Sequence, residues 1–163
     1  MKATLKVYLR NVEIYMYKFL VVTIFLTFLS ACAKPAADFT DVNGNPLYLS
    51  TLQEKWLVVN YWATWCAPCV KEIPELNRFS LEHVEAVTVL GVNFDQPRVS
   101  ERQSQVKKMK IEFPVFSEDP SKRLDVEMPA VLPTTYVFAP GGKLIKTLVG
   151  PQSEQSLLSA MTL

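Results

Sequence analysis

The stretch NYWATWCAPCVKEIP, residues 60–74, decides the fold of this 163-residue chain. It completes an unbroken apolar run, residues 56–62, which is typical of a strand that is buried on both faces of a sheet. Pro68 then stands in the first turn of a helix predicted over residues 68–81, where the missing N–H of proline is tolerated. Pro74, inside that helix, is expected to kink it. The two cysteines of the stretch therefore lie at a junction from strand to helix.

Cys66 and Cys69 lie on adjacent helical turns, so they can form a disulfide or separate as a dithiol. The helix N-terminus favours negative charge on Cys66 and should lower the pKa of its thiol, which makes Cys66 the attacking thiolate. Cys69, one turn inside, would resolve the mixed disulfide. A structural disulfide and half of a zinc site are the alternatives. A zinc site needs further ligands, and the chain has one histidine, His83, and no second cysteine pair.

Apolar and polar segments alternate along the rest of the chain. Strands are predicted at residues 86–94, 113–116, 134–138 and 143–149, and helices at residues 99–111 and 152–161. Asn43-Gly44 predicts a hairpin over residues 39–49, and Ser50 is predicted to cap a short helix that ends at Lys55. Strands that alternate with helices indicate an α/β fold, and the antiparallel strands near the end make its sheet mixed.

The composition excludes several classes of protein. Apolar residues make up 49% of the chain and charged residues 20%, which suits a packed core. The net charge is +1, and the short run Lys107, Lys108 and Lys110 is interpreted as the solvated face of a helix, so nucleic acid is not an expected partner. Three cysteines are too few for a secreted domain that is held together by disulfides.

Residues 1–31 are predicted to be a lipoprotein signal peptide. Basic residues precede an apolar run, residues 19–29, that is shorter than the roughly 20 residues of a membrane-spanning helix. A spanning anchor would need residues 12–17 to join this run, and Glu13 opposes that.

The stretch LSAC, residues 29–32, resembles the lipobox of bacterial lipoproteins. The resemblance implies that Cys32 is lipidated on its sulfur, so residues 32–38 form a lipidated tether and residues 39–163 the domain. An ordinary buried cysteine is the alternative. Ala33, in place of Asp, would favour the outer membrane over the inner under enteric-type sorting.

Residues 60–74 resemble the active-site stretch of thioredoxin-like proteins, and more narrowly that of the TlpA/ResA-type bacterial envelope thiol–disulfide oxidoreductases. The likeness runs from about residue 39 to residue 150. It implies a thioredoxin fold, in which helices flank a central mixed β-sheet. It also implies an N-terminal β-hairpin and a central β-α insertion, which residues 95–119 fit.

The resemblance implies roles for residues outside the cysteine pair. Leu132-Pro133 resembles the family's cis-proline segment, where the Leu132 backbone would pair with an extended substrate; an ordinary trans proline is the alternative. Trp65 is expected to exclude solvent and to contact substrate. Asn60 stands where ordinary thioredoxins carry a buried aspartate. Glu72, three residues beyond Cys69, is assigned as its acid/base group, and a solvent-facing glutamate is the alternative.

These features favour an enzyme, a protein-disulfide reductase in the cell envelope that faces the periplasm. Its clients would be cysteine-containing envelope proteins, as in cytochrome c maturation or disulfide repair, and its electrons would come from a membrane thiol carrier. A disulfide-forming oxidase remains open, because the environment of the pair sets its potential. A copper-binding assembly module is less favoured because such modules pair CxxxC with a distant histidine, and a peroxidase is also less favoured. No metal is expected, and no cofactor beyond the cysteine pair.

Overall fold

The computed structural model describes residues 16–20 and 36–161. Residues 16–20 are helical and belong to a unit separate from the one that begins at Ala37. Among the described residues, no helix has both the length and the apolar character that crossing a bilayer requires. Cys32 and most of the predicted signal peptide lie outside the described residues.

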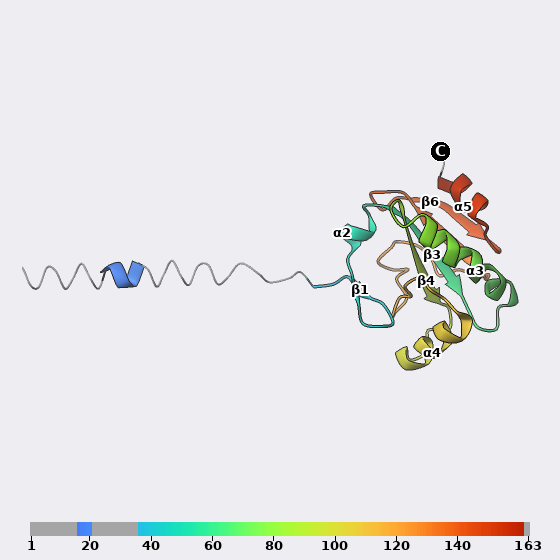
Figure 1. The fold of residues 1–163 in the computed structure, drawn as a ribbon, viewed down its shortest axis with the longest axis horizontal. Coiled ribbons are helices and arrows are strands. Elements are labelled where there is room, and N and C mark those ends of the chain that lie inside the picture. The colour runs from blue at the N-terminus through green and yellow to red at the C-terminus, as the bar shows by residue number, and fades with distance from the viewer. Residues whose placement is uncertain (1–15, 21–35, 162–163) are drawn as a thin grey trace, which may run out of the picture. The chain divides into compact units, whose positions relative to one another are not determined.

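A four-stranded mixed sheet forms the centre of the domain (Figure 1). Its strands run in the order β4 (Val87–Asn93), β3 (Trp56–Trp62), β5 (Thr134–Phe138) and β6 (Leu144–Val149). β4 is parallel to β3, whereas β5 is antiparallel to β3 and β6 to β5. The predicted mixed sheet is confirmed. The continuous apolar run occupies β3 because this inner strand is covered on both faces.

Alternate residues of β3 serve two separate cores. Val58 and Trp62 join the cluster under the helices, whereas Val59 and Tyr61 join the cluster on the other face. The helical elements are α3 (Ala67–Glu82), α4 (Val99–Met109) and α5 (Glu154–Met161). α3 and α5 pack against each other (Figure 1). The last turn of α4 packs Val106 and Met109 against the same cluster. The predicted helix at residues 68–81 is thus confirmed, and it runs through Pro74.

The predicted N-terminal hairpin is present as a small sheet of its own. β1 (Phe39–Thr40) pairs antiparallel with β2 (Pro46–Leu47), and Gly44 in the turn has a φ of +84°, which glycine adopts without strain. The next element, α2 (Leu49–Leu52), begins before Ser50, so the predicted Ser50 cap is wrong. The Leu49 amide, the first of α2, instead donates to Asp38 Oδ2 at 2.8 Å. The hairpin between these two residues brings the Asp38 carboxylate close to the start of α2.

The strand predicted at residues 113–116 is not formed as such. This segment makes two isolated bridges, Gly91 with Val115 and Asp41 with Phe116. The Gly91 amide donates to the Pro114 carbonyl and the Phe116 amide donates to the Gly91 carbonyl, both at 2.9 Å. Proline has no N–H, so Pro114 can accept from the edge of the sheet but cannot donate to it, and no regular ladder develops.

The predicted insertion contains α4 and one buried charge. α4 is mostly exposed, as its polar sequence predicts, but Arg102 is buried. Its guanidinium donates to the carbonyls of Pro97, Phe116 and Ser117, and so connects the start of α4 to the bridging segment. Burial lowers the pKa of Arg102 from its ordinary value.

Candidate active site

The cysteine pair lies at the N-terminus of α3 as a disulfide between Cys66 and Cys69. Cys66 is the residue before the first helical turn, and the Cys69 amide points at its Sγ at 3.2 Å. Cys66 is 4% exposed and Cys69 is fully buried. When the disulfide opens, the helix end therefore stabilises negative charge on Cys66 Sγ, the more accessible of the two sulfurs.

Trp65 stands beside the pair with 64% of its surface exposed. Its indole N–H donates to both carboxylate oxygens of Asp95, at 3.1 and 3.0 Å, and its ring meets Phe94 edge to face. Asp95 directly follows β4, which is parallel to β3, so the residues after both strands lie at the same end of the sheet. Asp95 was not predicted as a site residue, although it follows a strand predicted to lie parallel to the one before Cys66, and the carboxyl ends of parallel strands lie together.

The Leu132–Pro133 peptide bond is cis, as the resemblance implies. Tyr61 pairs with Thr134 across β3 and β5, which places Pro133 at the end of β3 that leads to Cys66. Leu132 packs against the core cluster that contains both cysteines. The structure thus brings the cis-proline segment to the redox pair, while the pairing of the Leu132 backbone with a substrate stays a prediction.

Glu72 lies on the buried face of α3 and is 3% exposed, so the solvent-facing alternative is wrong. It shares the buried face of the helix with Cys69. Its Oε1 accepts from Asn60 Nδ2 and its Oε2 accepts from the Gln152 amide, both at 2.9 Å. Burial raises the pKa of the Glu72 carboxyl above its ordinary value, and the two hydrogen bonds oppose the rise.

Asn60 connects this carboxyl to the strand that follows the cis-proline. Its side-chain amide donates to Glu72 and also to Thr135 Oγ1 at 3.0 Å, while its Oδ1 has no partner in the described part of the chain. Asn60 cannot titrate. The ionisable group beneath the pair is therefore supplied by α3 through Glu72 rather than by β3.

A surface cleft of about 370 Å³ opens at Glu72. Lys71, Glu75 and Gln152 line it, together with the residues on either side of Gln152. Glu72 is thus buried but adjoins solvent at one side. Such a carboxyl can take a proton from an interior group and release it to water.

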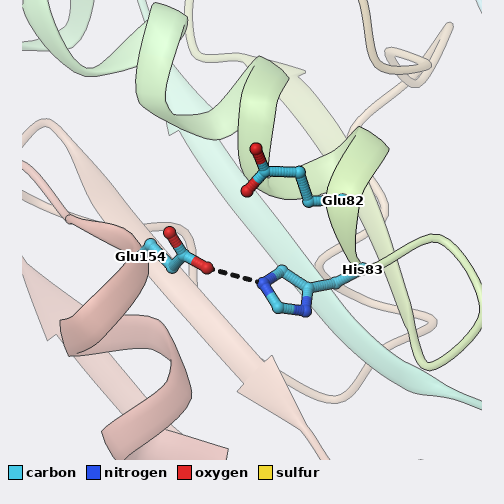
Figure 2. A group of neighbouring side chains, drawn as sticks. All are labelled: Glu82, His83 and Glu154. Carbon is cyan, nitrogen blue, oxygen red and sulfur yellow. Dashed lines mark hydrogen bonds and ion pairs between the residues drawn. The ribbon is translucent and has the colours of Figure 1, made fainter.

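The single histidine lies at the far end of α3 from the cysteines. Figure 2 shows His83 with Glu82 and with Glu154 of α5, and His83 Nε2 is 2.8 Å from Glu154 Oε1. Cys66 and His83 cap the two ends of the 16-residue α3, which separates them by about 25 Å. This contact joins α3 to α5, and it leaves the copper-binding alternative without a histidine near the cysteines.

Comparisons with known proteins agree with this geometry. Residues 32–147 match the family model described as the AhpC/TSA family. The thiol-disulfide oxidoreductase ResA of Bacillus subtilis (strain 168) is 32% identical over 124 residues, which cover 76% of this chain and 69% of that protein.

Two solved structures share the fold. The crystal structure of StoA from Bacillus subtilis superposes with a TM-score of 0.62 at 22% identity, covering 79% of this chain and 98% of that one. The pneumococcal exposed lipoprotein thioredoxin Etrx1 from Streptococcus pneumoniae strain TIGR4 gives 0.64 at 23% identity, covering 74% and 93%. Both show a thioredoxin-like fold.

Proposed function

Because the chain belongs to the AhpC/TSA family and is a thiol–disulfide oxidoreductase of the ResA type, we propose that it works as a reductase of client proteins in the cell envelope. The observation that carries the proposal is the Cys66–Cys69 pair at the N-terminus of α3, where helix amides stabilise a thiolate on the more accessible sulfur.

The reaction proceeds in two exchange steps. The Cys66 thiolate attacks a client disulfide, forms a mixed disulfide and releases one client thiolate, which takes up a proton. Cys69 then loses its proton and attacks Cys66 Sγ, which releases the second client thiolate. The client gains two electrons and the Cys66–Cys69 disulfide forms. A dithiol donor, proposed to be a membrane thiol carrier, must return these two electrons before the next cycle.

Glu72 is proposed to accept the Cys69 proton. Support comes from its place on the same buried face of α3 and from the cleft that connects it to solvent. The carboxylate form receives two hydrogen bonds, which keep its oxygens in place between turnovers. The raised pKa brings the carboxyl closer to neutral pH, where it can exchange protons with a thiol more readily.

Membrane attachment through a lipidated Cys32 is part of the proposal. The LSAC stretch supports it, and so does the description of one structural neighbour as an exposed lipoprotein. Lipidation would hold the domain at a membrane surface facing the periplasm, where its clients, for example in cytochrome c maturation or disulfide repair, carry oxidised cysteines. Under enteric-type sorting, Ala33 in place of Asp would favour the outer membrane over the inner.

Single cysteine variants of the full chain test the redox pair. Cys66→Ser should abolish exchange, because it removes the attacking thiolate. Cys69→Ser should accumulate a mixed disulfide with a client, visible as a band on non-reducing gels that reductant removes. Full exchange activity in both variants would contradict the assignment.

The reduction potential distinguishes the reductase from an oxidase. Known pairs of this kind span about −270 to −120 mV. A value near the lower end, measured by equilibration with dithiothreitol, supports the reductase. A value near the upper end would make the protein a disulfide-forming oxidase.

A further inference from the structure

A groove of about 510 Å³ begins beside the disulfide and is lined by α3 and by the C-terminal end of α4. Two of its lining residues adjoin the redox pair, since Thr64 lies two residues before Cys66 and Val70 directly follows Cys69. A protein that reaches Cys66 therefore also reaches the mouth of this groove.

The wall on α3 is apolar and open to solvent. Val70 and Pro74 are exposed and lie one turn apart, and Ile73 forms the buried floor between them. Pro74 has no N–H, so it cannot donate to the Val70 carbonyl as another residue in a helix would. The groove thus presents exposed apolar side chains beside a backbone acceptor that lacks its usual helical donor.

The opposite wall is hydrogen-bonded to α3 through the side chain of Asn77. Asn77 donates to the Lys110 carbonyl at 2.7 Å and accepts from the Glu112 amide at 2.9 Å. Lys110 itself ends α4 in the left-handed conformation, with a φ of +56°. These contacts fix the shape of the groove before any ligand arrives, which reduces the entropy cost of binding.

The rim of the groove is basic. Lys108 and Lys110 line it and are exposed, whereas Glu112 is the one acidic residue among the lining side chains. Met109 adds a further apolar surface between the two lysines. The lysine run that the sequence alone places on a solvated helix face thus borders an apolar groove next to the cysteines.

We propose that this groove docks the client segment around the reactive cysteine, and that the segment carries an apolar side chain for the floor and a carboxylate for Lys108 and Lys110. The inference rests on the proposed function, because only a client must come close enough to form a mixed disulfide with Cys66. The continuity of the groove with the redox pair favours a client over a second copy of the chain. The charge of the rim selects an acidic segment.

Peptide disulfides test this proposal on the reduced full chain. One probe is a peptide with the sequence Glu-Leu-Cys-Leu-Glu and the other has lysine in place of both glutamates; each cysteine is joined to 2-mercaptoethanol. Stopped-flow tryptophan fluorescence gives the second-order rate constants. We expect the acidic peptide to react about three- to ten-fold faster at low salt, and the preference to fall at high salt because exposed charges are screened.

Two variants on adjacent positions of α4 provide the matched comparison. Lys108→Glu should abolish or invert the preference for the acidic peptide. Lys107→Glu makes the same change of net charge at an exposed position outside the groove, and should keep most of the preference. Equal effects of the two variants, or equal rates of the two peptides with the wild-type chain, would overturn the docking proposal.

The small probe 2-hydroxyethyl disulfide distinguishes failure of the groove proposal from failure of the proposed function on which it rests. If the chain exchanges with this probe but does not discriminate between the peptides, the groove proposal alone fails. If the chain does not exchange with the probe at all, the proposed function fails and the groove proposal falls with it. Concentration-dependent dimerisation that Lys108→Glu abolishes would identify a second copy as the occupant and would also overturn it.

Discussion

At the scale of single residues, the two cysteines have different surroundings, and disulfide exchange requires a different property of each. Cys66 receives its stabilisation from helix amides, whereas the buried Cys69 shares its helix face with the carboxyl of Glu72. Asn60 holds that carboxyl without competing for its proton. The acid/base role thus depends on the burial of one glutamate, and its titration can be measured.

Glu72→Gln tests this burial through the pH dependence of stability. Burial disfavours the carboxylate, so the folded protein binds the Glu72 proton more tightly than the unfolded chain does. The stability that the neutral carboxyl contributes is fully present below its ordinary pKa of 4.5, and is lost as the pH rises through the raised folded pKa. Glutamine stays neutral, so the variant should gain stability relative to wild type above pH 4.5, by about 1.4 kcal/mol per unit of pKa shift.

Urea denaturation of the oxidised chain at several pH values measures this difference. Glu54→Gln removes a carboxylate at an exposed position outside the site and is the control for the change of net charge. Alkylation of the reduced pair gives a second readout, since a Glu72 that exchanges protons with Cys69 must alter the pH profile of thiol reactivity when it is replaced. An unchanged profile would remove Glu72 from the mechanism.

At the scale of elements, residues 113–116 pack closely beside β4 without forming a regular strand. The segment around Val115 runs parallel to β4 at Gly91, where the backbones form two hydrogen bonds. A Cβ added at Gly91 would lie 2.9 Å from Trp62 Nε1, 3.0 Å from Phe113 and 3.1 Å from Val115. Glycine at this position therefore permits the approach of the segment that follows α4.

Gly91→Ala should destabilise the domain by about 1–3 kcal/mol, because overpacking forces neighbouring side chains or backbone to move. The free energy of unfolding from urea titration measures the effect. The variant should keep its capacity for disulfide exchange in the folded state, because Gly91 pairs with Asn60 inside the sheet whereas the cysteines lie beyond the end of β3. An unchanged unfolding midpoint would mean that the segment around Val115 moves away without cost in free energy.

At the scale of the whole molecule, the end of β3 carries the proposed reaction, and the N-terminal segment is proposed to determine its location in the cell. Trp65 and the cysteines meet the cis-proline segment at one end of β3, although residues 65–69 and 132–133 are far apart in sequence. Residues 1–38, the predicted signal peptide and tether, are proposed to attach the domain to a membrane. Lipidation of Cys32 would restrict the domain to clients at a membrane surface.

Cys32→Ser tests the anchor in cells. We expect the full chain to shift from the membrane fraction to the soluble envelope fraction, because the acyl chains can no longer attach. Cys66→Ser is the matched control, since it removes a cysteine without touching the proposed anchor, and it should stay in the membrane fraction. Retention of Cys32→Ser in the membrane would instead point to an uncleaved apolar helix at the N-terminus.

Local patterns were sufficient for the elements that carry the redox pair. The apolar run of residues 56–62 and Pro68 at a helix start are properties of neighbouring residues, and they located β3, the beginning of α3 and the two cysteines. Family resemblance added the cis bond at Pro133. These features could be predicted because hydrophobic periodicity, proline geometry and a short spacing of cysteines need no knowledge of distant parts of the chain.

The remaining features were decided by contacts between residues far apart in sequence. Asp95 reaches Trp65, the Gln152 amide reaches Glu72, and Asp38 caps α2 in place of Ser50, each only after the strands and the hairpin have assembled. The segment around Pro114 was predicted to be a strand from its local sequence, but its contacts with distant residues leave it with only isolated bridges. The sequence by itself identified the redox cysteines, whereas the tertiary structure decided their neighbours and the raised pKa of Glu72, because burial and hydrogen bonding depend on which elements pack together.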